Sequence, residues 1–119
     1  MAMPAVRLTL KKSDKLRQRC QFEEARRDGV KEIGSFLLLV HLPAPRVECG
    51  VICSKKYSLL SVERNRARRL LWEAFRLLKP QIRPCRLVLI ARARLKKCSG
   101  TQVREEMEQL LRGAGLLNP

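Results

Sequence analysis

The segment from Ser61 to Lys79 constrains the fold most, because its apolar residues recur at helical spacing. At 100° per residue these side chains share one arc of a helix, and the polar residues occupy the opposite arc. Ser61 is the expected N-cap, Glu63 in the first turn favours the helix dipole, and Pro80 ends the helix. One face of this helix must therefore pack against another layer. The apolar arc consists of Ala67, Leu70, Leu71, Ala74, Phe75, Leu77 and Leu78.

The other face of the same helix is rich in arginine, with only Glu63 and Glu73 to offset the charge. The whole chain agrees, since 26 Lys and Arg residues against 11 Asp and Glu residues give a formal net charge of +15. Such an excess indicates a polyanionic partner, although an ordinary solvated helix face is the alternative interpretation. The polar and aromatic residues of this segment include Arg64, Asn65, Arg66, Arg68, Arg69, Trp72 and Arg76.

Trp72 projects into the basic arc, away from Leu71 and Ala74. Three interpretations of this indole stay open: it stacks on a nucleic-acid base, it covers Arg68 or Arg76 in a cation–π contact, or it docks against the N-terminal segment.

The remaining elements predict an α+β sandwich, in which one sheet is backed by helices in the order αβββαβα. The strands at 36–42 and 46–54 are joined by Pro43-Ala44-Pro45, and we expect them to form a hairpin. Length and apolar content fit a single domain over 1–119, with residues 1–12 forming a basic, flexible N-terminal segment. The other expected elements are a helix at 13–27, strands at 30–33 and 86–91, and a helix at 102–112.

Several functional classes lack the residues they need. An 18-residue apolar run and a signal peptide are both missing from the sequence, so we expect a cytoplasmic protein with no membrane partner.

The five cysteines include no CxxC pair, which predicts reduced, partly buried thiols and no zinc site. His41 is the only histidine, and we expect it to be structural or superficial. The acids cluster in Glu23-Glu24-Asp28 and Glu105-Glu106-Glu108, on helices expected to be solvated, so we predict no catalytic residue and no metal ligand in this chain.

Four motifs together resemble the protein subunit of bacterial ribonuclease P. The resemblance covers about residues 7–112 and includes Phe22 and Gly29 upstream of the first strands. The motifs are Ser54-Lys55-Lys56, then Val62-x-Arg64-Asn65-Arg66-x-Arg68-Arg69, then Glu73-Ala74-Phe75-Arg76, then Leu87-Val88-Leu89-Ile90-Ala91-Arg92.

This resemblance implies a function and a fold. Members of the family bind a large catalytic RNA, and the holoenzyme removes the 5′ leader of precursor tRNA. The implied fold is a mixed-sheet αβββαβα sandwich, similar to domain 2 of ribosomal protein S5, with a left-handed βαβ crossover. The chemistry is then carried by the RNA, which also holds most of the Mg²⁺.

The same resemblance implies roles for individual residues. Phe22, Phe36 and Lys56 fall where the family lines a cleft for the single-stranded leader, and arginine and aromatic side chains suit phosphate and unpaired bases respectively. The residues expected to face the catalytic RNA are Lys55, Arg64, Asn65, Arg66, Arg68, Arg69, Trp72 and Arg76.

The chain departs from the family pattern in its cleft, and two other classes remain open. Arg26 and the Leu39-Val40 pair stand where aromatic residues are common, and Arg86 replaces an acidic residue. A ribosomal or ribosome-assembly protein would share the charge and the fold but would not need an aromatic cleft. A protein-only nuclease would need acids that converge in the cleft.

Overall fold

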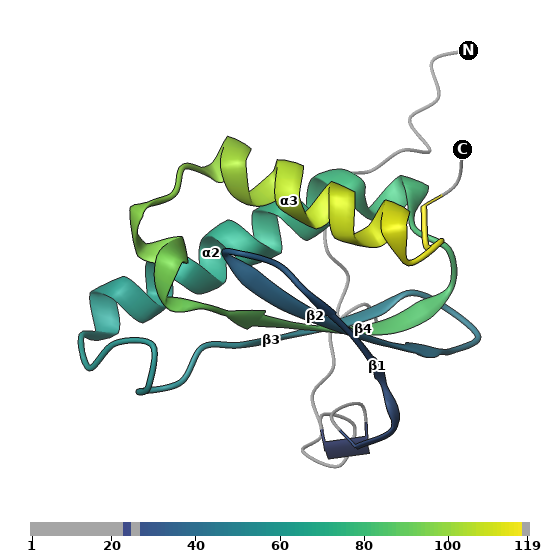
Figure 1. Ribbon diagram of the computed structural model, residues 1–119, viewed down its shortest axis with the longest axis horizontal. Coiled ribbons are helices and arrows are strands. Elements are labelled where there is room, and N and C mark those ends of the chain that lie inside the picture. Colours follow the sequence, from purple (N-terminus) through teal and green to yellow (C-terminus); the bar gives the residue numbers. More distant parts are fainter. Residues whose placement is uncertain (1–22, 25–26, 118–119) are drawn as a thin grey trace.

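A computed structural model describes residues 23–24 and 27–117, which form a four-stranded sheet with two long helices on one face (Figure 1). This arrangement confirms the predicted α+β class. Residues 23, 24, 27 and 28 are helical, while the rest of the predicted 13–27 helix and the 1–12 segment lie outside the described residues. The elements are β1 (Val30–Ile33), β2 (Leu37–Pro43), β3 (Glu48–Ile52), α2 (Ser61–Leu78), η2 (Lys79–Gln81), β4 (Cys85–Ala91), η3 (Ala93–Lys97) and α3 (Gly100–Gly113).

The strands are ordered β1-β2-β4-β3, so the predicted hairpin between 36–42 and 46–54 is wrong. β4 lies between those two strands, pairing antiparallel with β2 and parallel with β3. The hairpin partner of β2 is β1, with Ile33 opposite Leu38. The physical reason is that β2 and β4 are continuous apolar runs, which gain most from central positions where both faces are covered. The more polar β1 and β3 take the edges.

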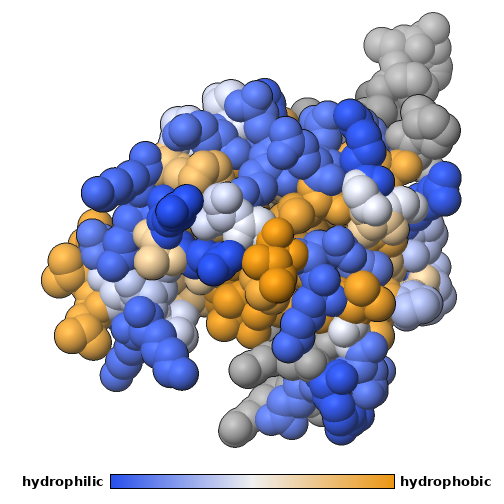
Figure 2. All heavy atoms as spheres, viewed as in Figure 1, coloured by the Kyte–Doolittle hydropathy of each residue, from blue (hydrophilic) through white to orange (hydrophobic). Residues whose placement is uncertain are grey.

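The long helix α2 packs on the sheet through the predicted apolar arc, of which five residues are buried. Its N-cap is Leu60 rather than the predicted Ser61, and no side chain caps it. The Ser58 hydroxyl in the preceding loop accepts from the Leu60 backbone N–H at 3.0 Å, and the loop therefore orders the helix start. The buried residues of α2 are Ala67, Leu71, Ala74, Phe75 and Leu78. Hydrophilic side chains cover much of the surface over α3 (Figure 2).

The helix α3 ties the β1–β2 turn to the helical layer through Glu106. Its carboxylate accepts from the backbone N–H groups of Ser35, Phe36 and Leu37 at 2.7, 2.7 and 3.0 Å. Glu106 is thus half-buried and bonded, which corrects the prediction that this acidic group is solvated. A Cβ at Gly34 would lie 2.6 Å from Glu106 Oε2, so only glycine allows this close approach. The helix begins with a capping box between Ser99 and Gln102.

The sheet has an apolar second face, opposite the helices. Val40 and Val88 are fully buried there, surrounded by partly buried side chains. Leu38 and Ile90 are among these neighbours, and this face forms the floor of the cleft described below.

The described cysteines, Cys49, Cys53, Cys85 and Cys98, are buried free thiols, as predicted, whereas Cys20 lies outside the described residues. Burial raises the pKa of Cys85 to about 11. The described helices include none that is long and apolar enough to cross a membrane.

Candidate nucleic-acid interface

Three arginines at the start of α2 are held in place by backbone carbonyl groups. Arg64 donates to the carbonyl oxygen of Ser58 at 2.8 Å. Arg68 donates to that of Cys53 at 3.0 Å. On the other side of the helix, Arg66 donates to the Cys98 carbonyl oxygen at 2.6 Å. The three guanidinium groups are therefore oriented by the end of β3, the following loop and the end of η3.

These anchors orient the guanidinium groups without neutralising them, because a carbonyl acceptor carries no net charge. A guanidinium has five N–H donors, so each arginine keeps donors for a further acceptor. Glu63 is the only acid between residues 54 and 69, and its carboxylate accepts from the buried Ser58 hydroxyl. Burial raises the pKa of the Cys53 thiol, and the nearby charges of Arg68, Arg64 and Lys96 oppose that rise. The region thus has a positive field.

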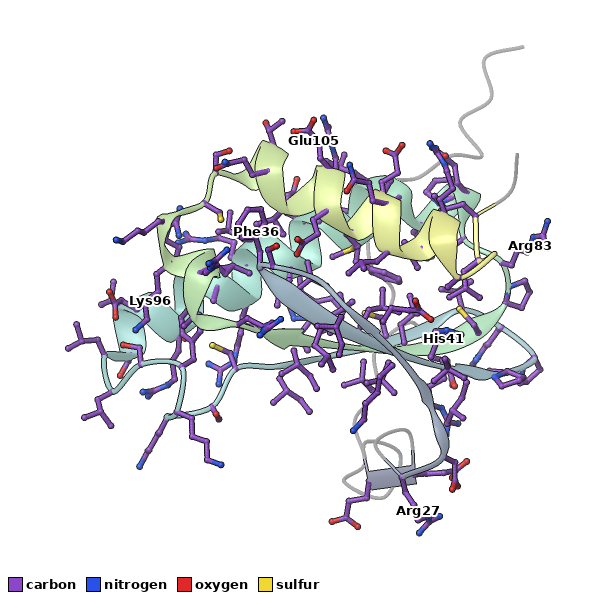
Figure 3. The ribbon with its side chains drawn as sticks, in the orientation of Figure 1. Arg27, Phe36, His41, Arg83, Lys96 and Glu105 are labelled. Carbon is purple, nitrogen blue, oxygen red and sulfur yellow. The ribbon has the colours of Figure 1, made fainter. Side chains whose placement is uncertain are left out.

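Other predicted RNA contacts lie around the same three arginines. Lys55 and Lys56 are exposed in the loop after β3, and Asn65 accepts from Arg68 at 3.3 Å through its side-chain oxygen. Arg69 is exposed and has no hydrogen bond or ion pair to any residue that the structure describes. Figure 3 shows Lys96 near this end of α2, and its ammonium group lies 5.3 Å from the centre of the Tyr57 ring. Sequence reasoning missed Lys96, which η3 brings to the surface defined by α2.

The last two predicted RNA contacts lie further along α2. Trp72 is half-buried and packs edge-to-face on Phe75, with ring centres 6.1 Å apart. Arg76 forms an ion pair with Glu73, which raises the pKa of the guanidinium group and lowers that of the carboxyl group. Arg64 and Arg76 are 12 positions apart in the sequence, or about 18 Å along the helix. The unneutralised charge is therefore concentrated at the first half of α2.

A cleft of about 690 Å³ opens on the second face of the sheet. Its floor is apolar, formed by side chains of β1, β2 and β4, and its rim carries cations. The floor residues are Ile33, Leu38, Val40 and Ile90, and the rim residues include Arg27, Lys31, Arg92 and the acid Glu23. An apolar floor with a cationic rim suits a single strand, whose bases are flat and apolar and whose backbone is anionic.

Two of the predicted leader-binding residues, Phe36 and Lys56, are not among the described residues that line this cleft. Phe36 packs against the core on the helix side, and Figure 3 shows it beside α3, far from Arg27 on the other side of the sheet. Lys56 is exposed in the loop before α2. Phe22 lies outside the described residues. Sequence reasoning missed the cleft cations Arg27 and Lys31, although the continuous apolar run of β2 indicates a strand that is covered on both faces.

Arg86 links the cleft wall to the sheet. It donates to Glu48 of the neighbouring strand at 3.2 Å and lies 3.5 Å from Glu24, next to the rim residue Glu23. The side chains of Arg86 and Glu48 are largely buried, so removing either one would leave the other charge poorly solvated and unpaired in the sheet. His41 lies 3.5 Å from Glu32 across β1 and β2. Within residues 23–24 and 27–117, no group of three or more potential metal ligands is brought together.

Comparisons with known proteins cover most of the chain. The model of the family described as Ribonuclease P matches residues 10–115. The Ribonuclease P protein component of Roseiflexus castenholzii is 37% identical over 112 residues, covering 91% of this chain and 91% of the relative. That of Synechococcus sp. (strain JA-2-3B'a(2-13)) is 34% identical over 110 residues, covering 87% and 83%.

Solved structures have the same fold. The RNase P protein of Staphylococcus aureus at 2.0 Å superposes with a TM-score of 0.80, at 22% identity, covering 90% of this chain and all of that one. The RNase P protein of Thermotoga maritima superposes with a TM-score of 0.75, at 23% identity, covering 83% and 96%.

Proposed function

This chain belongs to the ribonuclease P protein family, and we propose that it binds the catalytic RNA of the holoenzyme through the first half of α2. As a family member it is the protein component of an endoribonuclease that processes the 5′ end of tRNA. The ribosomal alternative is not favoured, because the family match and the relatives named above are ribonuclease P proteins.

One observation carries the RNA-binding proposal. Arg64, Arg66 and Arg68 are oriented by neutral carbonyl oxygens, so the fold fixes their geometry while their charge is kept for a phosphate partner. An arginine paired with a carboxylate, such as Arg76 with Glu73, must first give up that partner. Lys55, Asn65 and Arg69 extend the same surface, and the roles of Trp72 and Arg76 further along α2 stay predictions.

We further propose that the 5′ leader of precursor tRNA crosses the cleft on the second face of the sheet. Its apolar floor supports contact with unpaired bases, and Lys31 and Arg92 on the rim suit the phosphates. Phe36, on the helix side, would act on the leader only indirectly, by supporting the β1–β2 turn. Phe22 and Lys56 keep their predicted roles as leader contacts.

The proposed holoenzyme uses Mg²⁺ held mainly by the RNA, in the cytoplasm. In the described part of this chain the acids are held in ion pairs, accept structural hydrogen bonds or lie on exposed helix faces, which supports an RNA partner as the source of the chemistry. Phosphate-rich RNA binds Mg²⁺ through oxygen, the ligand this ion prefers.

The salt dependence of binding to a bacterial ribonuclease P RNA tests the interface. Each lost phosphate contact should reduce the slope of log Kd against log salt by about 0.7–0.9. Arg69→Ala is the cleanest single change, because this exposed side chain holds no other described residue. Arg64→Ala with Arg68→Ala should reduce the slope by about 1.4–1.8.

The matched control removes two arginines from other surfaces. Arg46→Ala with Arg112→Ala takes away the same charge, and both side chains lie by carboxylates, Glu48 and Glu108. We expect the control to leave the slope near the wild-type value. Equal slopes in the control and in the Arg64 and Arg68 variant would refute the assigned surface.

A comparison of precursor tRNA with mature tRNA tests the proposed leader contact separately. Lys31→Ala, and independently Phe22→Ala, should weaken the holoenzyme's affinity for precursor tRNA while mature tRNA binds as before. An equal loss for both substrates would show that these side chains do not read the leader.

A further inference from the structure

The loop that enters α2 exposes apolar side chains at its tip. Leu59 is 82% exposed, Leu60 is 63% exposed and Val62 is 80% exposed. Among the described residues, only Val30 and Ile33 are comparably exposed large apolar residues, and Ile33 belongs to the cleft. At the left edge of Figure 2, apolar spheres protrude between hydrophilic ones, where Figure 1 shows the start of α2. Three such residues within four positions form a local patch rather than scattered exposure.

The backbone of this tip is held by hydrogen bonds that involve Ser58 and Leu60. Ser58 is 8% exposed, its hydroxyl donates to Glu63 and accepts from the Leu60 N–H, and its carbonyl oxygen accepts from Arg64. Tyr57 beside it is buried, and its backbone N–H donates to Ser54 at 3.0 Å. The backbone of the tip is therefore preorganised, and ordering it for a partner costs little further entropy.

The charge around the tip indicates which partner fits. Lys55 and Lys56 precede it, the arginines of α2 follow it, and Lys96 and Lys97 of η3 are exposed on the neighbouring segment. The one nearby acid, Glu63, is engaged by Ser58. An apolar tip inside a cationic surface complements a polyanion that also displays apolar surface, and unpaired nucleobases on a phosphate backbone meet both conditions.

We infer that Leu59 and Leu60 form an apolar contact with unpaired bases of the catalytic RNA, next to the phosphate contacts of the α2 arginines. This inference rests on the proposed function. Apolar side chains inserted against base steps are an established way for proteins to hold nucleic acid beside a charged surface. The tip would add affinity that does not depend on counterion release, because no charge is neutralised in the contact.

The test measures the affinity of the full chain for a bacterial ribonuclease P RNA across a salt series. The wild type is compared with the double variant Leu59→Ala with Leu60→Ala. Neither leucine is buried, so the variant should fold with unchanged stability, which thermal unfolding checks. We expect binding about tenfold weaker at every salt concentration, with an unchanged slope. Arg69→Ala should instead reduce the slope. Val30→Ala is the matched control, because Val30 is 55% exposed on β1 and does not line the cleft. It should change neither the affinity nor the salt slope.

Other outcomes would overturn the inference. Wild-type affinity in the double leucine variant would refute base contact while leaving the proposed function intact, since wild-type binding and its arginine dependence would stand. If the same variant lost only self-association of the RNA-free protein, measured by sedimentation, the tip would bind a second copy. If it lost only binding to vesicles of anionic phospholipid, the tip would be a lipid contact. Failure of the wild type to bind the RNA would reject the proposed function itself.

Discussion

Replacing Glu106 with alanine should destabilise the fold more than its position on an outer helix suggests. The change removes three charge-assisted hydrogen bonds to the β1–β2 turn, of which those to Phe36 and Leu37 are partly buried. Water can replace the bond to exposed Ser35, so the two partly buried bonds dominate the loss. Hydrogen bonds to charged groups contribute about 1.5–3 kcal/mol each, and partial solvent access reduces that, which gives about 2–4 kcal/mol in total.

This magnitude is measurable because the free energy of unfolding of a small domain is only about 5–15 kcal/mol. We expect the Glu106→Ala variant to melt about 10 °C below the wild type. The melting temperature of Glu106→Gln should lie between those of the wild type and Glu106→Ala. Its amide oxygen can still accept from the N–H groups of Phe36 and Leu37, whereas its NH2 group cannot accept from the Ser35 N–H. Thermal and urea unfolding followed by circular dichroism give both values.

Glu105→Ala is the matched control, because Glu105 is exposed on the adjacent position of the same helix (Figure 3). Its melting temperature should stay within about 2 °C of the wild type. Equal melting temperatures for the Glu105 and Glu106 variants would refute the view that Glu106 fixes the turn. Below its melting temperature the Glu106 variant should retain the salt slope for RNA, since α2 is not altered.

Three further predictions concern α2, the buried thiols and the start of α3. Titrating catalytic RNA should quench Trp72 fluorescence and shield the indole from acrylamide; emission that is blue-shifted in the free protein and indifferent to RNA would contradict the contact. Burial raises the pKa of Cys85 from 9.0 to about 11, so the thiol ionises more readily in the unfolded chain than in the folded protein. The free energy of unfolding should therefore be unaffected by this thiol below about pH 9 and should fall as the pH rises from about 9 to about 11. Urea midpoints that do not fall over this range would contradict that sign, as would rapid alkylation of Cys85 in the folded protein at about pH 8. Ser99→Ala removes the capping box of α3 and should cost about 1 kcal/mol, which an unchanged urea midpoint would disprove.

Helical periodicity was sufficient to predict α2 and its buried face, because residues three and four positions apart, such as Leu71, Phe75 and Leu78, lie on the same face of a helix. Strand positions could also be predicted, but pairing could not. Nearness in sequence favoured a hairpin of 36–42 with 46–54, whereas burial placed β4 between them. The better signal was that β2 and β4 are the most continuous apolar runs, which indicates central strands covered on both faces.

In the candidate site, too, the residues on one helix could be predicted from the sequence, whereas contacts between distant residues could not. The arginine cluster is local, since one helix carries it, and its residues were therefore visible in the sequence. The neutral anchors of those arginines come from residues up to 32 positions away, such as Cys98 for Arg66, and they depend on η3 packing beside α2. The Glu106 contact with Phe36 joins residues 70 positions apart, and no periodicity encodes such a pair.

Cleavage of a precursor tRNA by a bacterial ribonuclease P RNA at low magnesium tests the central claim most directly. The account predicts that adding this protein accelerates release of the 5′ leader and that the protein without RNA cleaves nothing. Arg64→Ala with Arg68→Ala should reduce the stimulation, while Arg46→Ala with Arg112→Ala should keep it. Cleavage at the same rate with and without the wild-type protein, or cleavage by the protein alone, would contradict the account.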